Sequence, residues 1–266
     1  MAGNLVVSTI NGQAIGVKNA IINGNFAINQ RGVSGTVTLA AGAYGHDRWK
    51  AGASGCTYTF ATSDNVTTIT ISAGSLIQVV EGLNLYTNTY TLSWTGTAQG
   101  KIGAGSYAAS GVTGSVTGGS NLNIEFNTGT LSLVQLEAGS VASPFERRDY
   151  GRELAMCQRY YERITGTGNG PALPAVMNGS TNVDAFVAWK VQKRATPTVS
   201  GASGSGFVTG EIGSTGYTTN GFTGAFQLSD FGARIRASST TSQTSGQAGS
   251  FIFSSASMWV DASAEL

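Results

Sequence analysis

Apolar and polar residues alternate along most of the first half of the chain. Between residues 121 and 127, the apolar positions are Leu122, Ile124 and Phe126, and the segments 68–72 and 90–94 repeat this pattern. Because successive side chains of a strand point to opposite faces, each segment has one face for a core and one for solvent. This pattern predicts antiparallel sheets packed as a β-sandwich.

The pattern changes between residues 146 and 163, where charged residues are dense. Apolar residues from Leu154 to Ile164 recur at helical spacing along one stripe. Asp149 has the side chain of an N-cap residue. We therefore expect one amphipathic helix from Tyr150 to Arg163, with Glu162 in its solvated end.

Alternation returns in the last third of the chain. Val183, Ala185 and Val187 occupy every second position, and 222–228, 234–237 and 251–253 are further strand candidates. The sequence therefore predicts an all-β fold, with two jelly-roll-like β-sandwich domains joined by one short α-helix. The expected parts are an N-terminal arm at 1–18 with a strand at 5–10, a sandwich at 19–148, the helix at 149–164, and a C-terminal sandwich at 165–266.

Composition narrows the classes of partner. Charged residues make up 11% of the chain, against about 25% in an average globular protein, and the net charge is +1. No long-range field therefore steers the protein to nucleic acid or to an anionic membrane. No apolar run reaches the ~20 residues of a membrane span, and the first residues lack the features of a signal peptide. We expect folding in a cytoplasm, and a hydroxyl-rich surface suited either to uncharged glycans or simply to persistence outside a cell.

Few residues suggest catalysis. His46 is the only histidine, and its neighbour Asp47 points to the opposite face of an extended chain, so the two do not form a dyad by adjacency. We expect His46 to be a structural polar residue where a strand begins. Glu125 and Glu137 lie on nearby predicted strands and are the one pair of carboxylates that could come close enough for glycoside hydrolysis. No metal-ligand cluster or cofactor fingerprint occurs, so no catalytic residue, metal or cofactor is predicted.

Cysteine and aromatic residues divide into buried and exposed groups. Cys56 and Cys157 are too few for a disulfide scaffold or a zinc site, and we expect two buried, inert thiols. Three tryptophans, at 49, 94 and 189, are expected in cores. Three tyrosines lie among glycines and other small residues without strand periodicity, and each is either an incidental exposed residue or a platform for a sugar ring: Tyr44, Tyr107 and Tyr217.

Two blocks of sequence carry a family resemblance. The first block runs from Asn19 to Trp49 and contains Asn-Gly-Asn-Phe, Gln-Arg-Gly and Asp-Arg-Trp; the second runs from Val134 to Glu162 and contains Gln-Leu-Glu, Pro-Phe-Glu and Cys-Gln-Arg-Tyr-Tyr. Together they resemble a group of phage tail-fibre proteins. The resemblance implies a jelly-roll module between the blocks, a helix after it, and a variable C-terminal tip. The jelly-roll module is similar in outline to carbohydrate-binding modules, many of which hold calcium through acidic residues of the last strand. The corresponding strand here, at 131–135, has no acidic residue, so calcium is not predicted.

The resemblance implies a function. By this resemblance, the chain is expected to be a non-catalytic receptor-binding protein of a tail fibre or baseplate, which forms a homotrimer and attaches the virion to a glycan on the host surface. Its other partners would be tail or baseplate proteins. Two alternatives stay open, namely a glycan depolymerase on a tail spike and a purely structural tail or baseplate protein.

Overall fold

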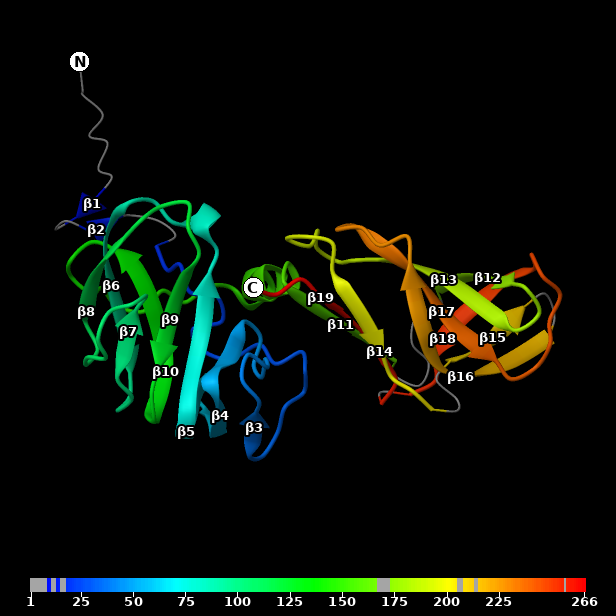
Figure 1. The fold of residues 1–266 in the computed structure, drawn as a ribbon, viewed down its shortest axis with the longest axis horizontal. Coiled ribbons are helices and arrows are strands. Elements are labelled where there is room, and N and C mark those ends of the chain that lie inside the picture. The colour runs from blue at the N-terminus through cyan, green and yellow to red at the C-terminus, as the bar shows by residue number, and fades with distance from the viewer. Residues whose placement is uncertain are drawn as a thin grey trace, which may run out of the picture. The chain divides into compact units, whose positions relative to one another are not determined.

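A computed structural model describes residues 9–10, 13–14, 18–166, 173–204, 208–212, 215–255 and 257–266 (Figure 1). Nearly all of its regular structure is strand, so the all-β prediction is confirmed. The chain forms two compact units, and each is described by itself. The first comprises residues up to Cys157 together with Leu266, and the second comprises Gln158–Glu265.

The first unit is an antiparallel sheet that bends around one core. Strand β5 (Val66–Val80) pairs with β10 through residues 69–71 and with β9 through residues 76–80, so the sheet divides along this strand. The path is β3-β4-β5-β10-β6-β8, with β9 pairing β5 and β7. The strands are β3 (Val37–Leu39), β4 (Trp49–Ser63), β5 (Val66–Val80), β6 (Asn88–Thr95), β7 (Gly100–Ile102), β8 (Val112–Val116), β9 (Leu122–Phe126) and β10 (Gly129–Ala138), and a 3-10 turn, η1 (Gly82–Asn84), follows β5.

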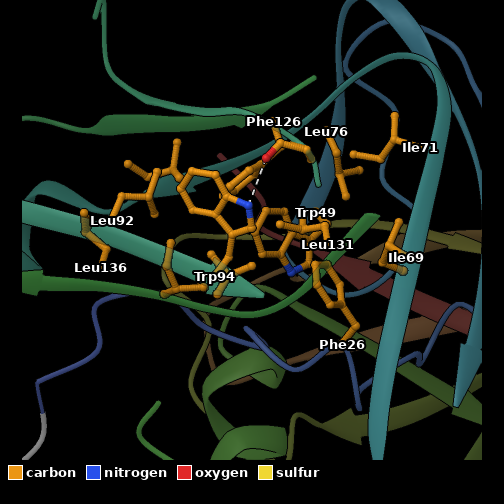
Figure 2. Close-up of a cluster of buried hydrophobic side chains, with 14 of the residues drawn as sticks. Phe26, Trp49, Ile69, Ile71, Leu76, Leu92, Trp94, Phe126, Leu131 and Leu136 are labelled. Atoms are coloured by element: carbon orange, nitrogen blue, oxygen red, sulfur yellow. Dashed lines mark hydrogen bonds between the residues drawn. The ribbon is translucent and has the colours of Figure 1, made fainter. Parts of the chain in front are cut away.

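The core of the first unit follows the alternating pattern. Ile124 and Phe126 are fully buried on β9, whereas Asn123 is exposed and Glu125, between the two apolar residues, is half-buried. The ring of Phe126 lies between Trp94, with ring centroids 5.0 Å apart, and Trp49, with centroids 6.1 Å apart (Figure 2). Both tryptophans are buried, so their predicted burial is confirmed. Burial of such large rings contributes strongly to the stability of the core.

The two blocks of the family resemblance bond to each other. The side-chain oxygen of Asn19 accepts from the amide of Leu136, and its amide nitrogen donates to the carbonyl of Val134. Val134 in turn donates its amide to the carbonyl of Gly24, where an added Cβ would lie 2.2 Å from Val134 O. The opening block therefore lies against the closing strand β10 through buried hydrogen bonds, which explains these residues as scaffold.

The predicted helix is shorter than expected. α1 (Tyr150–Gln158) begins after Asp149, whose side chain accepts the amide of Gly151, so the predicted cap is confirmed. The prediction that the helix continues to residue 163 is wrong, because Tyr161–Thr165 forms strand β11. This strand pairs with β19 (Trp259–Ser263), where Arg163 opposes Asp261 and bonds its carboxylate at 2.7 Å. A partner nearly 100 residues away overrides the local helical pattern.

The second unit contains a closed barrel, and not the sandwich predicted for 165–266. The strand order around the barrel is β12-β13-β17-β16-β15-β18. The last seam closes because glycines let β15 and β18 approach: a Cβ on Gly249 would lie 1.9 Å from Glu211 O, and one on Gly210 would lie 2.1 Å from Ser250 O. The strands are β12 (Leu173–Asn178), β13 (Asn182–Ala188), β15 (Val208–Ile212), β16 (Thr215–Phe226), β17 (Gly232–Ser239) and β18 (Ala248–Phe253), and a separate sheet joins β11, β19 and β14 (Thr198–Gly201).

A fully buried ion pair lies in the second unit. The ammonium of Lys193 is 2.7 Å from a carboxylate oxygen of Glu162, and both side chains have no exposure. The same ammonium donates to the carbonyl of Gln158, and Glu162 accepts the amide of Lys190. The expectation that Glu162 is solvated is therefore wrong, since strand pairing of β11 turns its side chain inward.

Part of the predicted N-terminal arm lies outside the described residues. Within it, β1 (Thr9–Ile10) pairs with β2 (Gln13–Ala14) in a two-stranded antiparallel sheet. The predicted strand at 5–10 is thus described only in its last two residues. In the part of the chain that the structure describes, no helix has the length and apolar character needed to cross a membrane.

Candidate functional site

Three exposed phenylalanines gather on one wall of the barrel. The strand register places Arg234 of β17 between Phe186 of β13 and Phe226 of β16. Phe186 is 54% exposed and Phe226 39%, while Val187, which follows Phe186, and Ile235, which follows Arg234, are buried in the core of the unit. We call this wall the phenylalanine face, and its members are Phe186, Phe226, Phe231, Arg234 and Arg236.

The charges on the phenylalanine face do not balance. Asp184 is buried and bonds Arg236 through both of its oxygens, at 2.5 and 2.8 Å. Burial opposes ionisation of Asp184, but hydrogen bonds from Arg236 and Asn178 hold its pKa below the ordinary value. One carboxylate, that of Asp184, therefore faces the two guanidinium groups of Arg234 and Arg236, and these three groups together carry a net charge of +1 at neutral pH.

The guanidinium of Arg234 forms no hydrogen bond with the described residues. Its Nε lies 3.6 Å from Asp184, beyond hydrogen-bond distance, and is buried with no hydrogen-bond partner among the described residues. Its guanidinium lies 5.2 Å from the centre of the Phe226 ring, and that of Arg236 lies 4.7 Å from the same centre. Cation–π contact holds both groups over the ring without using their N–H donors.

A tight turn between β16 and β17 presents Phe231. The hydroxyl of Ser229 accepts the amides of Phe231 and Gly232, and the amide of Trp189 donates to Phe231 O. Gly232 is required, because a Cβ there would lie 2.5 Å from Val187 O. Phe231, although 62% exposed, is thus held by a backbone that is fixed on both sides.

The turn and the strand β13 line an open, shallow hollow of about 390 Å³ at the surface. Phe186 and Phe231 both line it, and Arg234 and Gln227 add polar groups. Apolar walls with a few converging donors are the usual composition of a small-ligand site. Asp230, in the same turn, does not line the hollow and instead accepts from Gln192 at 2.6 Å.

Comparison with known proteins gives no family. No family model matches the chain, and no curated protein matches it either. What the phenylalanine face does must therefore be argued from its own geometry and from the resemblance of the two sequence blocks.

The predicted tyrosines occupy three different environments. Tyr44 is half-buried between cations, with Arg31 5.1 Å and Lys50 5.9 Å from its ring centre. Tyr107 is half-buried beneath Lys101, whose ammonium lies 4.7 Å from the ring centre. No two of these three tyrosines line the same described hollow.

Tyr107 belongs to a polar cluster on the first unit. Lys101 lies 2.8 Å from Glu125, and the hydroxyl of Ser75 donates to the same carboxylate at 2.6 Å. Although burial raises it, the hydrogen bonds from Lys101 and Ser75 leave the pKa of Glu125 below its ordinary value. The charges of this cluster compensate each other, which contrasts with the phenylalanine face.

Tyr217 differs from its expected exposure. It lies within β16, only 4% exposed, and its hydroxyl donates to Ser250 O at 2.5 Å. Burial raises the pKa of this phenol. Tyr217 borders an open hollow of about 620 Å³ with mainly Gly, Thr and Ser neighbours. The flanking Gly216 suggested a loop, but strand pairing with Gly210 of β15 buries the ring.

The other polar candidates are structural. His46 is buried beside Tyr58, with Nδ1 3.0 Å from the hydroxyl, and desolvation lowers its pKa to about 4. Glu137 accepts the hydroxyl of Ser143 at 2.6 Å and is buried, whereas Glu125 bonds Lys101, so the two carboxylates belong to separate networks. Cys56 and Cys157 are buried, as predicted, and are not joined by a disulfide, and burial raises the pKa of Cys56 to about 11.

Sequence reasoning missed the phenylalanine face although a signal was present. Once Val183, Ala185 and Val187 are assigned to the core, period 2 places Phe186 on the solvent side of the same strand. The same holds for Arg234 and Arg236 around the buried Ile235. A large aromatic residue at a position that the alternation assigns to solvent is the informative exception.

Proposed function

We propose that this chain is a non-catalytic receptor-binding protein of a phage tail fibre or baseplate, which attaches the virion to a glycan on the host surface. The phenylalanine face is the observation that carries this proposal. Exposing three phenylalanines on a rigid strand-and-turn wall has no benefit for folding. Sugar rings present C–H faces that stack on such rings.

The construction of the molecule supports a presenting role. The buried side chain of Asn19, in the opening block, bonds backbone atoms of the closing strand β10 and fixes the two blocks together. A homotrimer, which the resemblance implies, would present three barrels at once. Weak contacts at single barrels then suffice, because linked sites bind with a high effective concentration.

The test is binding of the purified full chain to an array of bacterial surface polysaccharides. We expect the wild type to bind at least one of them and the double variant Phe186→Ser/Phe231→Ser to bind about tenfold or more weakly. Tyr150→Ser is the matched control, because Tyr150 is as exposed as Phe231, at 62%, but belongs to the first unit.

Two outcomes would contradict the proposal. A wild type that binds no polysaccharide favours the structural alternative. Release of reducing ends or unsaturated sugars from a bound polymer favours the depolymerase.

A further inference from the structure

We infer that the hollow beside the phenylalanine face binds an acidic sugar residue, whose carboxylate or phosphate pairs with Arg234. The inference rests on the proposed function and specifies its ligand. It starts from the difference between the two arginines of the face. Arg236 forms a paired, two-point contact with Asp184, whereas Arg234 approaches the same carboxylate only to 3.6 Å, and no described residue accepts a hydrogen bond from its guanidinium.

The geometry selects an anion. A guanidinium offers parallel N–H donors that match the two oxygens of a carboxylate or phosphate, and because the Nε of Arg234 is buried, its two terminal nitrogens are the donors that would make this contact. Asp184 is already shared with Arg236, and Asp230 lies outside the lining of the hollow. An incoming acid group would therefore complete the charge balance of the face, and its sugar ring would lie between Phe186 and Phe231.

The site is also prepared for a ligand. Arg234 is held over the Phe226 ring, and only 24% of its side chain is exposed. The Ser229 hydroxyl and the Trp189 amide fix the turn that carries Phe231. Little conformational freedom remains to be lost on binding, which favours affinity at a small site.

The experiment uses an array of acidic bacterial polysaccharides, each printed in native form and after removal of its acid group. Carboxyl reduction serves uronic and sialic polymers, and dephosphorylated repeating units serve phosphate polymers. We expect wild-type binding to a native acidic polymer to fall about tenfold or more when the acid group is removed. Which treatment abolishes binding identifies the acid group.

Variants test the position of the contact. Arg234→Gln should weaken binding of the native acidic polymer by about tenfold, whereas Arg234→Lys, which keeps the charge but not the two-point geometry, should weaken it less. Lys190→Gln is the matched control, because it removes one positive charge from an exposed residue of the same unit that does not line the hollow. We expect this control to bind like the wild type.

Each contrary result has its own meaning. Binding to polysaccharides that is unchanged by removal of the acid group overturns this inference but leaves the proposed function standing. Equal losses in Arg234→Gln and Lys190→Gln overturn it in favour of diffuse charge attraction. If Phe231→Ser dissociates a stable oligomer, the face is an interface between copies, and the inference fails. Absence of any polysaccharide binding overturns the proposed function itself.

Discussion

Arg148 of the first unit and Arg234 of the second show two uses of the same side chain. Arg148 donates to the carbonyl oxygens of Asn19 and Ile21 and pairs with Glu153 at 3.2 Å. Arg234 lies on the ring of Phe226, and its nearest carboxylate oxygen is 3.6 Å away. The Nε of each is buried without a hydrogen-bond partner among the described residues, but the terminal nitrogens of Arg148 join two distant parts of a scaffold, whereas those of Arg234 donate no hydrogen bond to a described residue.

The same contrast extends to aromatic residues. In the first unit, Trp49, Trp94 and Phe126 meet in the hydrophobic core, where they contribute to folding (Figure 2). In the second, Phe186 and Phe231 line a hollow at the surface. The comparison teaches that the residues carrying the sequence resemblance define the scaffold, while the candidate binding residues lie in the part of the chain where the resemblance is weakest.

The largest expected effect concerns the buried ion pair of the second unit. Lys193→Met leaves the Glu162 carboxylate buried without its cation, so the unfolding free energy should fall by about 3–5 kcal/mol. Urea denaturation, followed by hydrogen exchange of peptides from each unit, measures the loss and shows whether it is confined to residues 158–265. The double variant Glu162→Gln/Lys193→Met, which removes both charges, should recover much of the stability. A single variant within 1 kcal/mol of the wild type would show that the pair contributes little.

The next effect distinguishes the first unit by its pH dependence. The folded-state pKa of His46 is about 4, against 6.5 without burial. Between these values the unfolded chain binds the proton and the folded chain does not, so stability is lost as pH falls from 6.5 to 4. The slope is about 1.4 kcal/mol per pH unit, or about 3 kcal/mol over this window. Hydrogen exchange of the first unit should show it.

His46→Gln provides the control for this pH effect. The variant cannot take up a proton there, so its stability profile should be flatter than that of the wild type by the same amount. The acidic residues titrate in both proteins, and their effect cancels in the difference. Parallel profiles between pH 6.5 and 4 would contradict the assignment.

The sequence was sufficient wherever one local rule decided the structure. Alternation alone identified the buried face of β9, and Asp149 alone identified the start of α1. It was insufficient where a distant strand competed with the local pattern. The stripe from Leu154 to Ile164 is helical in spacing, yet pairing with β19 makes Tyr161–Thr165 a strand.

Closure of the barrel and the binding face were harder to predict for a different reason. Alternation tells which face of a strand is buried, but not which strands distant in the sequence pair to close a barrel. The close approach at Gly210 and Gly249 is visible only when β15 and β18 are paired. Likewise, the hollow forms because the turn before β17 brings Phe231 beside the same hollow as Phe186 of β13, and no spacing in the sequence predicts that these two residues share a site.

The smallest expected effect sharpens the comparison between core and surface aromatics. Phe231→Ala should change the unfolding free energy by less than about 0.5 kcal/mol, because its ring is 62% exposed and its turn is fixed through backbone and Ser229 contacts. Phe251→Ala, in the fully buried interior of the same unit, should cost about 3–5 kcal/mol. Denaturation of both variants measures the difference. If Phe231→Ala also destabilises the unit by several kcal/mol, the Phe231 ring packs against protein, either within the chain or in a neighbouring copy. The argument that this ring is available for a ligand would then fail.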